Sequence, residues 1–271
     1  MSLRITRRNS AFQVLQSLAS NRQKRHQSRT FLVEGVRPIT IALERGWPFG
    51  AVIYAGGRKL SAWATDVIER TPHATRYELS EELLAELSRK EDTSEILAVL
   101  EMPDDGFERI PAPPDLLVIV ADRPASPGNL GTLLRSCDAF GAHGLIVSGH
   151  AADIYDPATI TASRGSLFAL PVVRTASAAS LATWITDVRD SLPQLRVVCA
   201  DEGGDATAFD SDLSGPTVLV LGNEAQGLSR AYLDLCDAVV RIPITGAASS
   251  LNVGVAGSIL LYEAARQRGR R

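Results

Sequence analysis

Three short segments in the second half of the chain place polar side chains beside glycines, a combination able to hold and activate a ligand. Pro127–Gly141 reads PGNLGTLLRSCDAFG, Val218–Ser229 reads VLVLGNEAQGLS, and the third segment, which follows Arg241, contains SSLNVGVAGS. In each, an apolar strand ends, glycine, asparagine or proline intervenes, and a helix begins. The candidate chemical groups are an arginine, a carboxylate and an asparagine: Arg135, Glu224 and Asn252.

The second segment resembles a phosphate-binding loop in layout but not in chemistry. That loop requires a lysine after its second glycine, because lysine and backbone amides together neutralise the phosphate. Here Leu228 follows Gly227, and Glu224 stands between the two glycines. A carboxylate repels phosphate but accepts a neutral or cationic ligand, such as a sulfonium cofactor. The alternative is that Glu224 caps a helix beginning near Leu228.

The other two segments each have a structural alternative. On a helix starting near Leu130, Arg135 lies one to two turns in, where it is either catalytic or an ordinary surface arginine. In the third segment Ser249 or Ser250 is a candidate cap, with Asn252 in the first turn of the helix. The small residues that follow suit either a ligand pocket or a tightly packed core helix.

Alternating strands and helices must position these segments. The first half predicts helices at Asn9–Ala19, Ala62–Arg70 and after the N-cap Ser80 in Leu79–Lys90, a strand, turn and helix within Thr30–Gly46, and strands at Gly50–Gly56 and Glu95–Met102. The interrupted stretch Met102–Asp115 reads as a linker. The second half predicts strands at Leu116–Asp122, Gly144–Gly149, Arg196–Asp201 and Thr217–Gly222, with helices at Leu130–Phe140, around Ala158–Leu167, at Ser180–Val188 and from Ser250. We therefore expect an α/β protein with domains at 1–106 and 115–271 and a linker at 107–114.

Composition narrows the function classes. No apolar run is long enough to span a membrane and MSLRITRRNS is not a secretory signal, so a cytoplasmic location is expected. The histidines offer no zinc spacing, which predicts no metal site, and structural burial is expected for Cys137, Cys199 and Cys236. The net charge of -3 does not favour general nucleic-acid binding, but Met1–Arg29 holds seven Arg or Lys and no acid. Such a segment either attracts polyphosphate or is a solvated terminus.

Taken together, the three segments resemble the signature motifs of the SpoU (TrmH-like) RNA ribose methyltransferases of the SPOUT superfamily. The shared motifs are Asn129-Leu-Gly131 with Arg135, Gly222-Asn-Glu224-Ala-Gln-Gly227, and Ile242-Pro243 followed by Ser250-Leu251-Asn252. The first half is similar to the L30e-like, ribosomal-protein-like substrate-binding domain of these enzymes, most clearly at Phe31–Ile39.

The resemblance implies a mostly parallel sheet tied in a trefoil knot, with S-adenosylmethionine bound in the knot. It assigns Arg135, Glu224, Ser250 and Asn252 to catalysis. The residues it assigns to the cofactor are Asn129, Leu221, Gly222, Gly227, Ile242, Ile244 and Leu251. The implied reaction is methyl transfer to a ribose 2′-oxygen of RNA, most often ribosomal RNA, with no metal required.

The resemblance also implies partners. These enzymes are homodimers in which the arginine reaches toward the partner's pocket, and RNA contacts are expected at Arg22, Lys24, Arg25, Arg29 and Arg37. Thr161 stands where relatives often carry a basic residue, and Arg164 is a possible substitute. The alternatives are a transfer-RNA 2′-O-methyltransferase and a non-catalytic RNA-binding or ribosome assembly factor that retains the fold.

Overall fold

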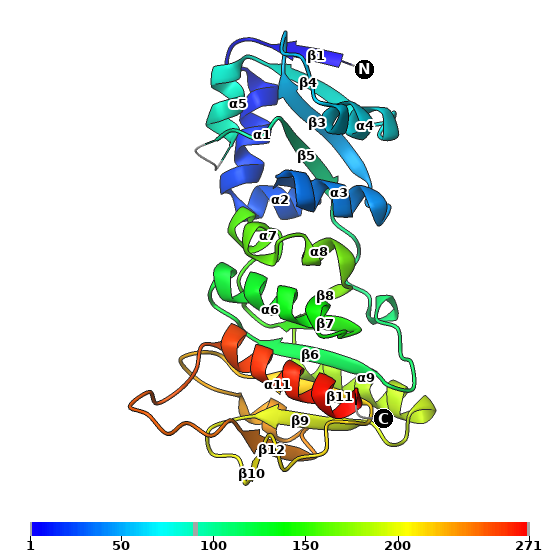
Figure 1. The fold of residues 1–271 in the computed structure, drawn as a ribbon, viewed down its shortest axis with the longest axis vertical. Helices are drawn as coiled ribbons and strands as arrows, with labels where there is room; N and C mark the ends of the chain where they lie inside the picture. The colour runs from blue at the N-terminus through cyan, green and yellow to red at the C-terminus, as the bar shows by residue number, and fades with distance from the viewer. Residues whose placement is uncertain (1, 89–91, 270–271) are drawn as a thin grey trace. The chain divides into compact units, whose positions relative to one another are not determined.

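The computed structural model describes residues 2–88 and 92–269, which form two compact units (Figure 1). Unit 1 contains Met1–Pro103 together with Tyr155–Ala169, and unit 2 contains Asp104–Ile154 and Leu170–Arg271. The segment Tyr155–Ala169 belongs to the second domain by sequence but packs with the first half of the chain. The cause is aromatic packing: the ring centroid of Phe31 lies 4.6 Å from that of Tyr155, and the Trp47 centroid lies 5.1 Å from that of Phe168.

Unit 1 is a five-stranded mixed sheet with helices. The strands lie in the order β1-β4-β3-β5-β2, and β5 pairs antiparallel with both β2 and β3. The strand bounds are β1 Ser2–Ile5, β2 Thr30–Glu34, β3 Phe49–Ala55, β4 Thr75–Leu79 and β5 Ile96–Glu101; the helices are α1 Ser10–Ser20, α2 Arg22–Ser28, α3 Val36–Glu44, α4 Ala62–Arg70, α5 Glu81–Leu87, α7 Pro157–Ser163 and α8 Ser166–Ala169. Strands β1 and β4 are not evident from the sequence.

The predicted helix starts in unit 1 have the expected physical cause. Asn9 accepts a hydrogen bond from the Phe12 N–H and caps α1, whose buried face is Phe12, Leu15 and Leu18. Ser80 caps α5 in the same way, as predicted. Arg89 and Lys90, which belong to the stretch containing α5, lie outside the described residues.

Unit 2 is a seven-stranded sheet in which every strand pair is parallel. The order is β10-β12-β9-β11-β6-β7-β8. The strand bounds are β6 Leu117–Asp122, β7 Gly144–Ser148, β8 Val172–Thr175, β9 Arg196–Ala200, β10 Ala206–Thr207, β11 Thr217–Leu221 and β12 Ala238–Arg241; the helices are α6 Pro127–Ala139, α9 Ala178–Ser191, α10 Arg230–Leu233 and α11 Val253–Arg268, with a 3-10 turn at Phe107–Arg109. Its central strands are continuous apolar runs because helices cover both faces.

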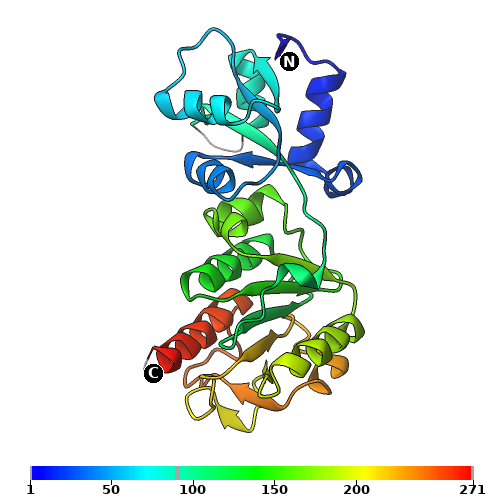
Figure 2. The same cartoon turned by 90° about the vertical axis from the view of Figure 1, so that its right-hand side faces the viewer.

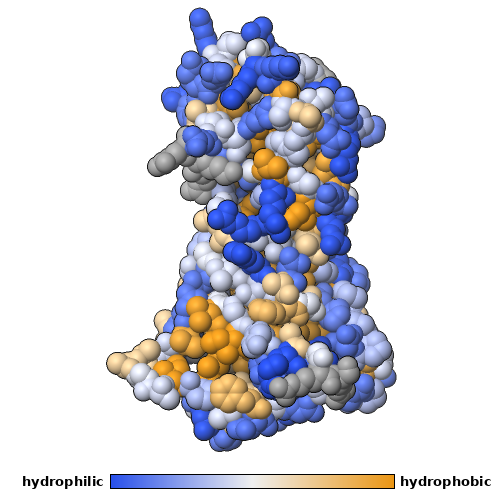
Figure 3. All heavy atoms as spheres, viewed as in Figure 1, coloured by the Kyte–Doolittle hydropathy of each residue, from blue (hydrophilic) through white to orange (hydrophobic). Residues whose placement is uncertain are grey.

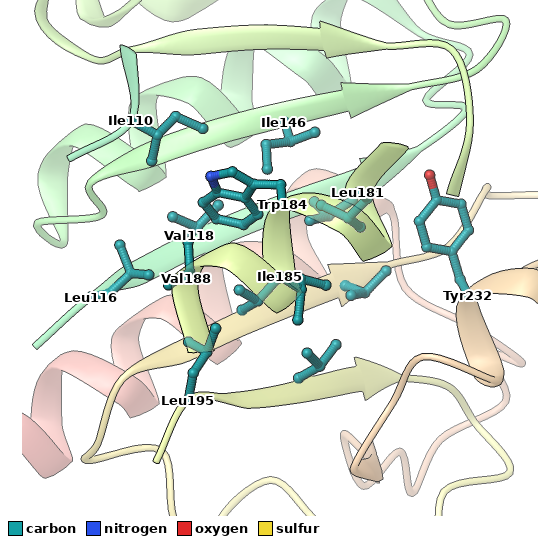
Figure 4. Packing of buried hydrophobic residues seen from close by; sticks show 14 of the residues in the cluster. Ile110, Leu116, Val118, Ile146, Leu181, Trp184, Ile185, Val188, Leu195 and Tyr232 are labelled. Carbon is teal, nitrogen blue, oxygen red and sulfur yellow. The ribbon is translucent and has the colours of Figure 1, made fainter. Parts of the chain in front are cut away.

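Figure 2 shows α9 on one face of this sheet and α6 with α11 on the other. Figure 4 shows Trp184, Ile185 and Val188 of α9 packed over Val118 of β6 and its neighbours. On the opposite face α11 and α6 lie very close together. A Cβ at Gly254 would be 3.1 Å from the Asn129 carbonyl oxygen, and one at Gly257 would be 2.4 Å from Leu133 Cδ1. The small residues of the third segment therefore serve helix packing.

Several predicted boundaries were wrong. Helix α6 begins at Pro127 with Ser126 as its cap, and α9 is longer than Ser180–Val188. The expected helix around Ala158–Leu167 is divided into α7 and α8 because Arg164 adopts a left-handed conformation, with φ 54°. The last helix begins at Val253, and its cap is Asn252 instead of Ser249 or Ser250.

The predicted burial of the three cysteines is correct for two of them. Cys137 and Cys199 are buried and burial raises the pKa of the Cys137 thiol, but Cys236 is half-buried and forms a disulfide with Cys199. Within 2–88 and 92–269 there is no helix long and apolar enough to cross a membrane. The same residues contain no cluster of three His, Cys, Asp or Glu side chains suited to a metal ion.

Candidate functional site

Side chains from the three sequence segments meet in one hydrogen-bonded chain. Asn252 Nδ2 donates to Asn129 Oδ1 at 2.6 Å, and Asn129 Nδ2 donates to Glu224 Oε1 at 2.9 Å. The other carboxylate oxygen of Glu224 accepts the Ala125 N–H at 3.3 Å. The predicted convergence of the segments is therefore present, and a capping asparagine connects it to the start of α11.

The position of this network follows from the sheet. Strand β11 pairs with β6 on one side and β9 on the other, and parallel strands present their carboxyl ends at one edge. In open α/β sheets that edge is where ligands bind. Helix α6, which follows β6, carries Asn129 in its first turn, the loop after β11 carries Glu224, and the segment after β12 leads to Asn252.

A pocket of about 560 Å³ lies at this edge. It is lined by the backbone and side chains of the loops after β9, β11 and β12 and by the start of α11. Eight predicted site residues line it: Leu221, Gly222, Glu224, Gly227, Ile242, Ile244, Ser250 and Leu251. Of the other predicted site residues, Asn129 and Asn252 adjoin the pocket through the network, whereas Arg135 is outside it.

Glycine is required at the entrance of the β11 loop. A Cβ at Gly222 would lie 2.6 Å from the carbonyl carbon of Gly227 and from the Leu228 nitrogen, which are backbone atoms. The two ends of the loop are this close because Asn223 and Gly227 exchange backbone hydrogen bonds of 3.1 and 2.9 Å. Gly227 has φ +63°, a conformation that favours glycine.

The pocket is acidic. Asp201, Glu202 and Glu224 line it, and no Lys, Arg or His is present among its described lining residues. Three carboxylates disfavour a phosphate ligand and suit a neutral or cationic one. Sequence reasoning missed Ala200, Asp201, Glu202 and Val240 as lining residues. The available signal was the position of Ala200 and Asp201 at the carboxyl end of a predicted strand.

The structural alternatives for Glu224 and Arg135 have different outcomes. Glu224 does not cap a helix, since α10 begins at Arg230 and its N-cap is Ser229. Arg135 is exposed on α6, and its side chain makes no hydrogen bond or ion pair with any residue that the structure describes. An arginine without a partner among the described residues is available to a substrate or a second subunit.

The predicted RNA-contact residues do not behave alike. Arg22, Lys24, Arg29 and Arg37 are exposed. Arg25 was predicted to contact RNA, but it is 1% exposed; it donates to the Leu18 carbonyl at 3.0 Å and forms an ion pair with Asp156 at 3.2 Å. A basic run on a short helix has one inward position, and Arg25 occupies it. Its role is structural.

Comparison with known sequences places the chain. The profile of the SpoU rRNA Methylase family matches residues 116–262, and that of the SpoU L30e-like domain matches residues 9–98. The chain belongs to the SpoU rRNA methylase family. The predicted family and the predicted α/β fold class, with a parallel sheet and a smaller N-terminal domain, are confirmed.

Individual SpoU relatives are similar over nearly the whole chain. The 23S rRNA (uridine(2479)-2′-O)-methyltransferase of Streptomyces viridochromogenes is 48% identical over 98% of this chain and 92% of its own length. The crystal structure of the SpoU methyltransferase AviRb from the same organism, in complex with AdoMet, has a TM-score of 0.91, 48% identity and coverage of 96% and 98%. An AdoMet-bound rRNA methyltransferase from Sinorhizobium meliloti has a TM-score of 0.88 at 28% identity, with 98% of each chain covered.

Proposed function

We propose that this protein transfers a methyl group from S-adenosylmethionine to a ribose 2′-hydroxyl of 23S ribosomal RNA. The observation that carries the proposal is the Asn252–Asn129–Glu224 network at the rim of an acidic pocket, built from the three motifs of the SpoU family. The choice of 23S RNA is supported by the S. viridochromogenes relative, which covers 98% of the chain.

The pocket residues suit S-adenosylmethionine. When bound, this cofactor supplies a methyl group on a cationic sulfur, which departs as a neutral thioether. Gly222 and Leu221 offer backbone atoms at the end of β11, and Ile242 and Leu251 offer apolar contacts beside them. The carboxylates attract a cation and repel a phosphate. Because the leaving group is good, holding donor and acceptor in line supplies much of the rate.

The chain's own contribution to the acceptor is positional and electrostatic. Glu224 is held at both oxygens, by Asn129 and by the Ala125 N–H, so its orientation at the rim is fixed. We assign Arg135 to the developing negative charge on the 2′-oxygen or to the adjacent phosphate, since a guanidinium group is positively charged and forms paired hydrogen bonds. Ser250 lines the pocket, together with Glu224.

A homodimer would give Arg135 a partner. On α11, Val255 and Tyr262 are 45% and 57% exposed and seven residues apart, so they lie on one face of the helix. Figure 3 shows apolar side chains gathered near the start of α11. Since α11 packs against α6, which carries Arg135, a second copy covering this face would approach the arginine.

RNA contacts are proposed at the exposed basic residues of unit 1, namely Arg22, Lys24, Arg29 and Arg37. Arg164 joins them because the Arg37 Nε donates to its carbonyl at 3.1 Å, which places two exposed arginines together. These contacts would be salt-sensitive and independent of base sequence. A cytoplasmic location, where ribosomal RNA is assembled into particles, is proposed with this substrate.

The test uses the full chain. Calorimetry with S-adenosylmethionine should give one site per subunit, and labelled methyl should appear on 23S RNA as a 2′-O-methyl nucleotide. Arg135→Lys should retain cofactor binding and lose turnover by about a hundredfold, because an ammonium lacks the paired geometry. Methylation confined to transfer RNA, or cofactor binding without methylation of any RNA, would contradict the proposal.

A further inference from the structure

Arg123, directly after β6, has a backbone conformation that is unusual for a residue other than glycine. Its φ is +49°, in the left-handed region that non-glycine residues rarely adopt. The other described non-glycine residues with positive φ, Arg29 and Arg164, end helices α2 and α7, which is an ordinary place for this conformation. Arg123 ends no helix. Such outliers persist where surrounding contacts hold them, and they concentrate at functional sites.

The contacts that hold Arg123 lead to the pocket. Its Nε and Nη2 donate to Oδ1 and Oδ2 of Asp122 at 3.0 and 2.9 Å, and the Asp122 side chain is only 2% exposed. Its Nη1 donates to Gln226 Oε1 at 2.5 Å, and Nη2 also lies 3.4 Å from the Gly227 carbonyl oxygen. One guanidinium therefore connects a buried carboxylate at the end of β6 with the far side of the β11 loop.

The backbone of Arg123 contributes a second connection to the same loop. Asn223 Nδ2 donates to the Arg123 carbonyl at 2.7 Å, while Asn223 Oδ1 accepts the N–H groups of Ala225 and Gln226. Space for the side chain is provided by Gly149, where a Cβ would lie 2.8 Å from Arg123 Cγ. The β11 loop is thus attached to β6 at its start through Asn223 and at its end through Gln226 and Gly227.

We propose that Arg123 is a positioning residue for the cofactor: it holds the 223–227 loop in the conformation that binds S-adenosylmethionine, without touching the ligand. Arg123 is not among the residues that line the pocket, whereas Asn223, Gln226 and Gly227 are. Asp122 keeps the guanidinium oriented, and its Oδ2 also lies 3.4 Å from the Ser229 N–H, which follows the loop. The inference rests on the proposed function, because it assigns the ligand of this pocket.

The position of Arg123 beside the 223–227 loop predicts which kinetic constant changes when this residue is replaced. Glu224 is anchored separately, by Asn129 and Ala125, so loosening the other half of the loop should weaken cofactor binding more than the chemical step. RNA binding involves other residues and should be unaffected. The left-handed backbone makes glycine the informative substitution, because glycine removes the guanidinium and relieves the strain at once.

The experiment compares Arg123→Gly with two further variants. In Arg123→Gly we expect the Kd and KM for S-adenosylmethionine to rise about tenfold, as for removal of a charge-assisted hydrogen bond. The kcat at saturating cofactor and the KM for RNA should change less than about twofold. Asp122→Asn/Arg123→Gly removes the unpaired buried carboxylate, and should recover thermal stability while the cofactor Kd stays raised. Arg174→Ala breaks a similar pair with Asp105, at 2.5 Å in the same unit, and should lower Tm without changing the cofactor Kd.

Three results would overturn the inference: an unchanged cofactor Kd in Arg123→Gly, a Kd that returns to normal in the double variant, or an equal rise in Arg174→Ala. The last two would mean that Arg123 acts only through stability. Failure of the wild-type protein to bind S-adenosylmethionine would instead refute the proposed function, so the two failures are distinguishable.

Discussion

Exchanging donor and acceptor between Asn129 and Glu224 tests whether their hydrogen bond organises the site. Asn129→Asp keeps the oxygen that accepts from Asn252, but replaces the donor to Glu224 with a second carboxylate oxygen at a position now 2.9 Å away. Glu224→Gln keeps the shape and adds a donor. The double variant restores one donor facing one carboxylate with the direction reversed.

The magnitude follows from the hydrogen bond that Asn129→Asp removes and from the negative charge that it adds. A hydrogen bond to a charged group contributes about 1.5–3 kcal/mol. Two unit charges about 3 Å apart repel by about 1.4 kcal/mol at the dielectric constant of water and about 5.5 kcal/mol at an effective value near 20. Both side chains are half-buried and rotation relieves part of the repulsion, so we expect a total of about 3 kcal/mol. This corresponds to about a hundredfold decrease in kcat/KM.

The assay is the initial rate of labelled methyl transfer at low substrate concentration. Glu224→Gln alone should lower the rate about tenfold, as for replacing a charged acceptor by a neutral one. The double variant should be more active than Asn129→Asp, which corresponds to a coupling energy above about 1.4 kcal/mol in the double-mutant cycle. Gln194→Glu, the same amide-to-acid change at an exposed residue of unit 2, is the control. A double variant no better than the product of the two single effects would refute the pairing.

Two further predictions concern stability. Burial lowers the pKa of His143, and nearby Arg268 lowers it further against the opposing effect of Asp115, so protonation favours the unfolded chain. The stability contributed by His143 is therefore complete above its unfolded pKa of about 6.5 and is lost as pH falls below that value. Between about pH 7.5 and 5.5, the Tm of His143→Gln should fall less than the Tm of the wild-type protein. An equal fall in the two proteins would contradict this. Arg25→Gln should lower the stability of unit 1 by about 2–4 kcal/mol, because it removes the ion pair with Asp156 and the buried hydrogen bond to the Leu18 carbonyl. The adjacent exposed Lys24→Gln should keep Tm and instead weaken RNA binding with a shallower salt dependence, and reversal of the two phenotypes would restore Arg25 to the RNA surface.

Sequence patterns predicted the elements that bury a continuous apolar surface. Strands β6, β9 and β11 are uninterrupted apolar runs, and α1 has a clear helical period. Strands β1, β8 and β12 have four residues each, too few for a period to emerge. These segments become strands by pairing with a longer neighbouring strand in the sheet, which is a tertiary interaction and not a local sequence preference.

Candidate site residues could be selected from the sequence where the chemistry of the loop restricts the residue type. They could not be selected where only the folded structure determines which way a side chain points. Gly222 and Glu224 could be selected because the loop needs a small residue and its acid excludes phosphate. Arg25 could not be separated from Lys24, since both belong to one basic run and only the fold shows which faces Asp156. Arg123 was missed because positive φ is invisible in a non-glycine residue.

Strand order explains why the third segment forms a wall of the pocket instead of a remote loop. Strand β12 pairs with β9, so it lies on the far side of β11 from β6. Yet Asn252, only eleven positions after the end of β12, donates to Asn129 in the first turn of α6, the helix that follows β6. The chain between them must return across the ends of β9 and β11, and Ile242, Ile244 and Leu251 line the pocket along the way. The asparagine hydrogen bond that closes the network therefore also holds this wall in place, which couples the pocket proposed for the cofactor to the Asn252–Asn129–Glu224 network at its rim.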